Sequence, residues 1–455
     1  MKKVLFINAI NSNSEVEQRY PNLGLGYLVG CLRKSFDNDI FDFKIIDRDV
    51  ENQILKYCPD IVGITCVSQN YNYAKKYANF AKGKNIPVII GGVHISMLPS
   101  SLSEGMDIGC VGEGEETIME LFNLFLKENK FLVNELSKIK GLVFRKNGKI
   151  IQTEKRERII NMNDIPYPAR DLLDIKKHSY MFTSRGCPYR CVFCASSRFW
   201  DNVRFFSAEY VVGEIKELVK NYGVQLISFF DDLFILDKKR LRDIVNLLKK
   251  QDFYKKVKFT CSCRVNLVDD ETAQLLKEMN VVSVGLGLES GNERILTYLK
   301  GGSITVQQNK EAIKIFKKYK IAVNASFVIG SSSETKEEIM QTYNFIKETP
   351  FDLVDIYVLT PYPGTPIWRH ALERGLVSDN MNWERLNVNF ERNKRAIILS
   401  EKLSKEEIYN IYKKFRRLRL LKNLKNIWRH PLVVDLPRYV FGLIFEKINL
   451  LLKKS

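Results

Sequence analysis

Short apolar runs alternate with amphipathic segments along the first 128 residues. The strand-like runs are VLFINA, DFKIID, IVGIT, PVIIGG and DIGCV, and helical patterns such as YNYAKKYANFAK lie between them. Short buried strands joined by helical crossovers are typical of a doubly wound parallel sheet. We therefore predict an α/β domain over residues 1–133.

Small and polar residues follow three of these predicted strands. Ligands of doubly wound sheets bind at the carboxyl ends of the strands, where glycine lets a backbone come close to a ligand. An ordinary turn is the alternative interpretation for each position taken alone. The residues expected at this edge are Thr65, Ser68, Gly91, Gly92, Gly112, Glu113 and Gly114.

Residues 134–176 have the composition of a connector, with an Asn147-Gly148 hairpin turn followed by prolines. From 177 to 395 the alternation resumes, with strand-like runs SYMFTSRG, LISFFDD, KFTCSC, VSVGLG, IAVNASFVIG and DLVDIYVLTP. Six strand and helix units predict a partial (β/α)6 barrel, in which reactive residues lie at the carboxyl ends of the strands.

The last region, residues 396–455, is predicted to be helical and basic. Residues 401–455 contain 14 Lys or Arg against 5 Asp or Glu, and Ile411, Phe415, Leu418, Leu421, Leu424 and Trp428 recur at helical spacing. We expect this helix to end near Pro431 and a second to span 439–452. The favoured interpretation is a helical cap with a solvated outer face. The alternative is peripheral docking on an anionic membrane, where each cation contributes about 1 kcal/mol.

Composition excludes several classes of protein. With 45% apolar residues in 455, the chain has enough material for large cores, and no run approaches the length of a membrane span. Met1–Ile10 is interpreted as a first strand rather than a signal peptide. Nine cysteines, three of them within eight positions, favour metal or redox chemistry in a reducing cytoplasm over disulfides. The net charge of +18 favours a polyanionic partner, but no nucleic-acid-binding motif accompanies it, so no nucleic acid is expected.

The most specific motif is RGCPYRCVFC, in which Cys187, Cys191 and Cys194 follow a predicted strand. Three thiolates on one loop can hold three irons of a 4Fe-4S cluster and leave the fourth iron open to an outside ligand. The alternative is a zinc site completed by His178, or by Cys261 or Cys263. Four histidines in the whole chain give no support to a Ser-His-Asp or Cys-His catalytic system.

This loop, with Phe193 just before Cys194, resembles the cluster loop of radical S-adenosylmethionine (SAM) enzymes. In that family SAM binds the open iron and is cleaved by one electron to a 5′-deoxyadenosyl radical, so an external donor of flavodoxin or ferredoxin type is implied. The resemblance assigns Asp231 and Asp232 to the methionine ammonium, where many members have Gly-Gly-Glu, and Arg264 to its carboxylate. The remaining implied SAM contacts are Phe193, Glu289, Ser290 and Gly330, the last within Phe327–Glu334, which resembles the adenine-contacting strand. An ordinary polar strand end is the alternative for each.

The placement of the N-terminal sheet ahead of such a barrel resembles the cobalamin-binding subgroup of the same superfamily, over about residues 1–395. The implied cobalamin contacts are Thr65, Ser68, Gly91, Gly92, Val93, His94, Gly112 and Glu113. Residues 1–93 contain no histidine, so cobalamin is expected to bind without an imidazole from the first loop. We expect His94 to pack or hydrogen-bond near the corrin rather than to ligate cobalt. A sheet that holds no cofactor is the alternative.

The resemblance predicts a cobalamin-dependent radical SAM methyltransferase that acts on an unactivated carbon of a small-molecule or lipid substrate. No protein residue beyond the cluster ligands is assigned a catalytic role. One alternative is a radical cyclase or rearrangement enzyme that binds cobalamin without methyl transfer. A second, of another class, is a non-catalytic cobalamin or redox sensor.

Overall fold

The computed structural model describes residues 1–11, 21–386 and 396–426. The chain forms two compact units, each with its own sheet. Met1–Asp174 and residues 361–386 belong to the first unit, whereas residues 175–360 and 398–426 belong to the second. The polypeptide therefore returns to its first unit after it has completed the strands of the second.

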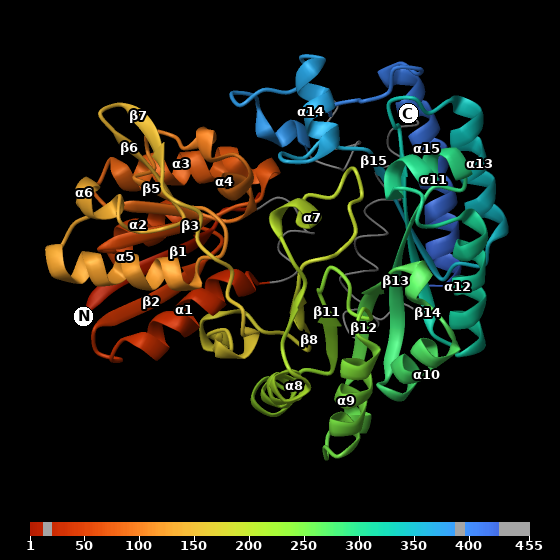
Figure 1. Cartoon of the computed structure of the whole chain (residues 1–455), viewed down its shortest axis with the longest axis horizontal. Coiled ribbons are helices and arrows are strands. Elements are labelled where there is room, and N and C mark those ends of the chain that lie inside the picture. Colours follow the sequence, from red (N-terminus) through yellow and green to blue (C-terminus); the bar gives the residue numbers. More distant parts are fainter. Residues whose placement is uncertain (12–20, 387–395, 427–455) are drawn as a thin grey trace. The chain divides into compact units, whose positions relative to one another are not determined.

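The first unit contains the predicted parallel sheet, with all five expected strands in the order β2-β1-β3-β4-β5. The strands are β1 Lys2–Asn8, β2 Phe41–Ile46, β3 Ile61–Thr65, β4 Val88–Gly91 and β5 Ile108–Cys110. The helices are α1 Leu23–Ser35, α2 Val50–Tyr57, α3 Tyr71–Lys82, α4 Val93–Met97 and α5 Glu115–Glu128. In Figure 1, α1 and α5 cover one face of the sheet, and α3 and α4 cover the other. Buried Phe6 and Phe122 stack in the core between β1 and α5.

The predicted hairpin adds two antiparallel strands to this sheet, β6 Leu142–Lys146 and β7 Lys149–Gln152, beside β5. Asn147 and Gly148 both have positive φ, which is the conformation that a tight two-residue hairpin turn requires. The sequence analysis assigned this hairpin to a connector, and in the structure it pairs with β5. The first unit runs on through the short helix α6 Val133–Leu136 and the hairpin to Asp174.

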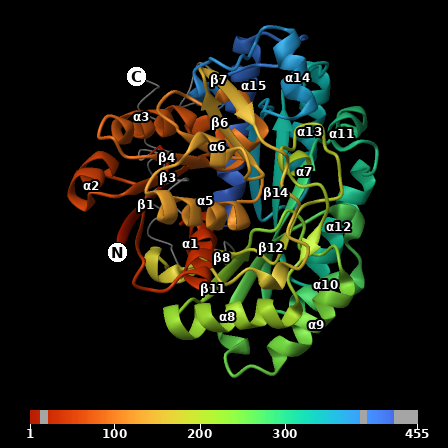
Figure 2. The same ribbon diagram turned by 60° about the vertical axis from the view of Figure 1, so that its left-hand side comes forward.

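The second unit is built on an all-parallel sheet in the order β8-β11-β12-β13-β14-β15, which confirms the six predicted strands of a partial barrel. These strands are β8 His178–Met181, β11 Leu226–Phe229, β12 Lys258–Cys263, β13 Val281–Glu289, β14 Ala322–Ile329 and β15 Leu353–Val358. The helices between them are α8 Ala208–Tyr222, α9 Lys238–Lys249, α10 Asp270–Glu278, α11 Glu293–Lys300, α12 Val306–Lys318 and α13 Lys336–Glu348. Figure 2 shows α8, α9, α10 and α12 following one another around the outside of these strands.

A short ribbon and helix carry the loop of the second unit that contains the three clustered cysteines. The ribbon pairs β9 Ser184–Arg185 with β10 Arg204–Phe205, and α7 Ser196–Phe199 lies between these strands in the chain. Gly186 begins the loop with φ of +98°, and a Cβ there would lie 2.5 Å from the carbonyl oxygen of Asn202. The turn into the cysteine loop therefore requires glycine.

The segment after β15 differs from its predicted assignment to the radical SAM domain. Helix α14 Pro366–Glu373 and the 3₁₀ helix η7 Trp383–Leu386 belong to the first unit. Asn72 of α3 donates to the side chain of Asn382 at 2.8 Å, and Ser100 donates to Asp379 at 3.0 Å. We call residues 361–386 the return segment. Local periodicity could not assign it, because its contacts are with residues about 290 positions earlier in the chain.

The predicted basic helix is α15 Lys405–Lys425, which begins with a capping box between Ser404 and Glu407. Ile411, Phe415 and Leu418 are buried as predicted, whereas Leu421 and Leu424 are 69% and 38% exposed. Trp428, the end near Pro431 and the predicted helix 439–452 lie outside the described residues. Among the helices that the structure describes, none has the length and apolar character needed to cross a bilayer.

Candidate active site

The three clustered cysteines lie on the loop between β9 and α7. Cys191 is buried, whereas Cys187 and Cys194 are half-buried, and all three are free thiols. The loop is held to the second unit by a backbone bond of 3.1 Å from Val192 N to Leu299 O of α11. Burial raises the pKa of the Cys187 and Cys194 thiols, so metal binding has to displace their protons.

The donor set fits an iron-sulfur cluster better than a zinc ion. Within the part of the chain that the structure describes, no three Cys, His, Asp or Glu side chains converge closely enough to hold one metal ion. Each cysteine of a 4Fe-4S cluster binds a different iron, so its ligands need not converge on one point. His178, the proposed zinc ligand, instead contacts Ser228 Oγ at 2.8 Å. Cys261 lies 3.8 Å from Cys263 on β12. The zinc interpretation therefore gains no support from this geometry.

Arg264, at the end of β12, reaches the cysteine loop directly. Its Nη1 lies 3.4 Å from Cys191 Sγ, and its Nη2 donates to Ser303 Oγ at 2.6 Å. The guanidinium lies 3.7 Å from the ring centroid of Tyr189, which stands between the first two cysteines in the sequence. Tyr189 and Ser303 were not among the predicted site residues. Tyr189 lies within the RGCPYRCVFC motif, but the sequence does not indicate that its side chain or that of Ser303 contacts Arg264.

Asp231 and Asp232 follow β11 but have different surroundings. Asp231 is buried and accepts hydrogen bonds from Thr183 N at 2.6 Å, from Ser184 Oγ at 2.7 Å and from the Thr183 hydroxyl. Asp232 is exposed and accepts from Ser196 Oγ at 2.6 Å, just after the third cysteine in the chain. Burial raises the pKa of the Asp231 carboxyl. Asp231 thus fixes the backbone that leads into the cysteine loop, and Asp232 is the more accessible member of the pair.

Glu289 and Lys300 form a buried ion pair at the end of β13. The Oε1 to Nζ distance is 2.8 Å, and both side chains are 8% exposed. Glu289 has a φ of +62°, which is uncommon for a residue other than glycine. A Cβ on Gly287 would lie 2.5 Å from Glu289 Oε1 and 3.3 Å from Lys300 Nζ, so glycine at this position leaves room for the pair.

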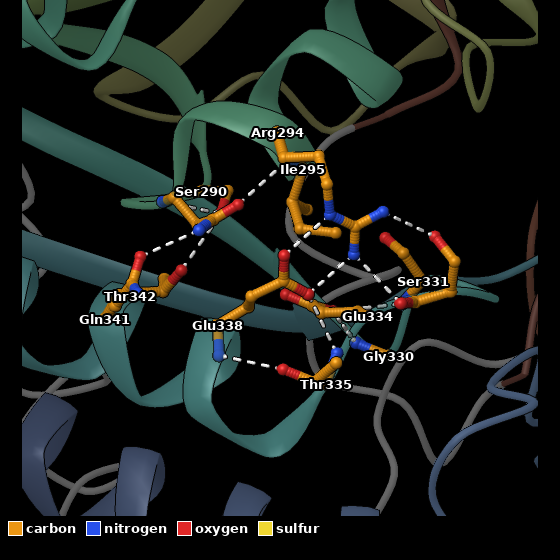
Figure 3. Close-up of polar contacts among 12 residues, drawn as sticks. Ser290, Arg294, Ile295, Gly330, Ser331, Glu334, Thr335, Glu338, Gln341 and Thr342 are labelled. Atoms are coloured by element: carbon orange, nitrogen blue, oxygen red, sulfur yellow. Dashed lines mark hydrogen bonds and ion pairs between the residues drawn. The ribbon is translucent and has the colours of Figure 1, made fainter.

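Ser290 and Gly330 hold the neighbouring turns together (Figure 3). Ser290 Oγ lies 3.0 Å from Thr342 Oγ1 of α13 and accepts from Asn292 N at 3.1 Å. Gly330 has a φ of +85°, and its N–H donates to Glu334 Oε2 at 2.7 Å. Glu334 also accepts from Ser331 N at 3.0 Å. Burial raises the pKa of Glu334 to about 7.

Arg294 of α11 also holds the turn that follows β14 (Figure 3). It makes a bidentate pair with Glu338, with both N–O distances at 2.6 Å, and donates to Ser333 O at 2.9 Å. The ends of β13 and β14 are therefore held by hydrogen bonds to two helices. In the sequence, this turn was indicated by the segment Phe327–Glu334. The structure shows a hydrogen bond within that segment, between Gly330 N–H and Glu334.

In the first unit, the predicted ligand edge brings the ends of β3 and β4 close together. Gly92 has a φ of +96°, and a Cβ there would lie 2.6 Å from Thr65 Oγ1. Ser68 Oγ lies 3.1 Å from Nδ1 of His94. His94 stands in the first turn of α4 and follows Gly91, Gly92 and Val93 in the chain. These predicted positions therefore lie close together at the carboxyl edge of the sheet.

His94 packs in an aromatic cluster that includes the return segment. It is fully buried, with its ring centroid 4.0 Å from that of Tyr71 and 4.4 Å from that of Trp383. Burial lowers the pKa of His94 to about 3, so the ring is neutral at physiological pH. His94 thus packs against protein side chains, and the expectation that it lies near a corrin stays a prediction. Trp383 was missed because nothing near it in the sequence marks it.

Gly112 and Glu113 lie at the same edge after β5. Gly112 has a φ of +92°, and its N–H donates to Ser96 Oγ of α4 at 3.0 Å. Glu113 is buried and accepts from Ile159 N at 3.1 Å. Glu113 therefore holds the loop that contains Ile159, and the turn at Gly112 is hydrogen-bonded to α4.

Comparison with known proteins matches both units to known families. Residues 13–122 match the B12 binding domain, and residues 181–346 match the Radical SAM superfamily. A protein of Pyrococcus horikoshii named as an uncharacterized methyltransferase is 36% identical over 401 residues, which cover 85% of each chain. The anaerobic magnesium-protoporphyrin IX monomethyl ester cyclase of Cereibacter sphaeroides is 26% identical over 403 residues, 83% of this chain and 65% of that protein.

The fold is also similar to a solved structure. The radical S-adenosylmethionine methyltransferase TsrM of Kitasatospora setae, with cobalamin and a 4Fe-4S cluster bound, aligns with a TM-score of 0.68 at 18% identity. The alignment covers 82% of this chain and 75% of that one. At this identity the similarity shows the fold, whereas the two matched domains and the relative at 36% identity show the family. The chain belongs to the radical SAM enzymes that carry a B12-binding domain.

Proposed function

We propose that this enzyme is a cobalamin-dependent radical SAM methyltransferase that acts on an unactivated carbon. The observation that carries the proposal is the loop with Cys187, Cys191 and Cys194, in a chain that also has a glycine-lined B12-domain edge. The relative named as a methyltransferase, similar over 85% of both chains, supports methyl transfer as the outcome. When bound, the cluster and SAM supply a 5′-deoxyadenosyl radical and cobalamin supplies the methyl group.

The protein's own residues bind and orient these groups. The three thiolates hold the cluster, and Asp232 accepts a hydrogen bond from the methionine ammonium, because it is the accessible carboxylate of its pair. The turn at Gly330, which Glu334 holds in place, is the proposed contact of the adenine. In the first unit, Thr65, Gly92 and Gly112 let cobalamin approach the backbone closely.

A reduced protein of flavodoxin or ferredoxin type is the proposed electron donor, and the substrate is a small molecule or a lipid. The buried side of α15 covers β15, which supports its role as a helical cap. The exposed side of α15 carries Lys414, Arg417 and Leu421. We propose this side for peripheral membrane contact of an otherwise cytoplasmic enzyme. Sedimentation with anionic vesicles, but not with neutral vesicles, tests that contact.

Anaerobic reconstitution with iron, sulfide, cobalamin and SAM, followed by mass spectrometry of the products, tests the function. Formation of both 5′-deoxyadenosine and S-adenosylhomocysteine supports methyl transfer. 5′-Deoxyadenosine alone favours a cyclase or rearrangement enzyme, which the similarity to the Cereibacter cyclase keeps as a second candidate. Absence of both products from protein that contains cluster and cobalamin would leave the sensor as the remaining interpretation.

A further inference from the structure

Arg264 contacts a sulfur that is itself a proposed cluster ligand. Its Nη1 lies 3.4 Å from Cys191 Sγ, and both side chains are buried, at 8% and 7% exposure. A guanidinium is charged at every accessible pH, so this contact is a charge-assisted hydrogen bond once the sulfur is a thiolate.

Two further contacts fix the orientation of the guanidinium. Its central carbon lies over the ring of Tyr189, 3.7 Å from the centroid, and Nη2 donates to Ser303 Oγ at 2.6 Å. Tyr189 is held in turn by a bond of 2.7 Å from Asn266 Nδ2 to its hydroxyl. A donor held in this way need not reorganise when the charge on the sulfur changes.

A positive donor near a cluster sulfur stabilises the more negative, reduced state. Hydrogen bonds to the sulfurs and nearby charge are two of the properties that set the reduction potential of an iron-sulfur cluster. Because the contact is buried, solvent screens it only weakly. We propose that Arg264 is a positioning residue that raises the reduction potential of the cluster by donating to Cys191 Sγ.

This inference rests on the proposed function, because it assumes a cluster on Cys187, Cys191 and Cys194. It differs from the predicted contact between Arg264 and the SAM carboxylate, so the potential should be measured without SAM. In the redox step, one electron from a reduced flavodoxin or ferredoxin converts the cluster from the 2+ to the 1+ state, and the donor is oxidised by one electron. No bond breaks and no proton moves.

The test is an anaerobic redox titration of reconstituted protein, followed by electron paramagnetic resonance of the 1+ cluster. Arg264→Gln should reduce the ratio of reduced to oxidised cluster at a given donor potential on the order of tenfold, which is about 59 mV for a one-electron couple. Arg264→Lys, which retains the charge but not the planar donor, should fall between this variant and the wild type. Arg190→Gln is the matched control. Arg190 lies in the same loop, but its guanidinium donates to the Ser197 carbonyl oxygen rather than to a sulfur.

An unchanged potential in Arg264→Gln would overturn the inference, as would an equal shift in Arg190→Gln, which would indicate a general charge effect. If Arg264→Gln fails to assemble a cluster, Arg264→Lys and Tyr189→Leu carry the test. Tyr189→Leu removes the ring that orients the guanidinium, so a wild-type potential in both variants would also overturn it. Wild-type protein that binds no iron at all would instead contradict the proposed function.

Discussion

Asn423 of α15 makes both backbone hydrogen bonds of Val354 on β15. Its Oδ1 accepts from Val354 N at 2.9 Å, and its Nδ2 donates to Val354 O at 3.1 Å. A side-chain amide thus takes the place that a neighbouring strand would occupy at the edge of the six-stranded sheet. The side chain of Asn426 likewise donates a hydrogen bond, from Nδ2 to Phe351 O at 3.1 Å. Helix α15 therefore protects an edge that would otherwise be open to pairing with another chain.

The first prediction concerns this edge. Asn423→Leu should lower the free energy of unfolding by about 2 kcal/mol, because it leaves a buried N–H and a buried C=O without partners. Urea denaturation of the purified protein measures the change. Asn410→Leu, on an exposed position of the same helix, should change stability by less than about 0.5 kcal/mol. Equal losses in the two variants would show that the bonds to Val354 contribute little.

The second prediction concerns the buried carboxyl of Glu334. Its pKa is raised by burial from 4.5 to about 7, so the folded state binds the proton more tightly than the unfolded state. Protonation therefore stabilises the fold below pH 4.5, and this contribution is lost as pH rises to 7, a loss of up to about 3 kcal/mol. Glu334→Gln cannot ionise, so its stability relative to the wild type should rise between pH 4.5 and 7 and then level off.

Glu338 provides a control of opposite sign. Its hydrogen bonds from Arg294 lower its pKa, so its carboxylate stabilises the fold above pH 4.5 and this contribution is lost as pH falls. Urea denaturation of Glu338→Gln should show a deficit at neutral pH that shrinks in acid. A Glu334→Gln profile parallel to that of the wild type from pH 5 to 8 would contradict the raised pKa.

The third prediction concerns Trp383, which contacts His94 and Tyr71 from the return segment. Trp383→Ala should open a large cavity beside the β4–α4 turn, and we expect at least a tenfold loss of cobalamin affinity. Absorbance of protein-bound cobalamin after gel filtration measures it. Iron content is an internal control, because the cysteine loop belongs to the second unit. Trp383→Phe should retain most of the cobalamin. If Trp383→Ala retained all of its cobalamin, Trp383 would not be needed to hold the β4–α4 turn for cobalamin binding.

These contacts mark the limit of what the sequence predicted. Periodicity identified the strands of both sheets, because alternation between buried strands and amphipathic helices depends on neighbours within a few residues. The same local pattern contains no information on the packing of Trp383 against His94. It also could not separate Asp231 from Asp232, which are adjacent in the chain, because hydrogen bonds from Thr183 and Ser184 make one of them structural. The Arg264 contact with Cys191 likewise depends on which strand ends meet.

The fourth prediction concerns the cluster ligands. Cys191→Ala should abolish the brown colour and most of the bound iron, because a 4Fe-4S cluster held by three thiolates loses one of them. Iron and sulfide analysis after anaerobic reconstitution measures the loss. Cys261→Ala, also buried in the second unit, should retain the full cluster. Loss of iron from Cys261→Ala as well would indicate that Cys261 is a ligand after all.

The fifth prediction compares two glycines on β13. Gly287→Ala places a Cβ 2.5 Å from Glu289 Oε1, so it should displace the Glu289–Lys300 pair and weaken SAM binding about tenfold or more. At Gly285 the nearest atom to an added Cβ is Ser262 Oγ, at an ordinary 3.6 Å, so Gly285→Ala should bind SAM normally. Equilibrium dialysis with labelled SAM on reconstituted protein distinguishes the two. Because both substitutions add one methyl group to the same strand, a shared loss would point to general disruption of β13, whereas normal binding in both would show that the ion pair does not contribute to the SAM site.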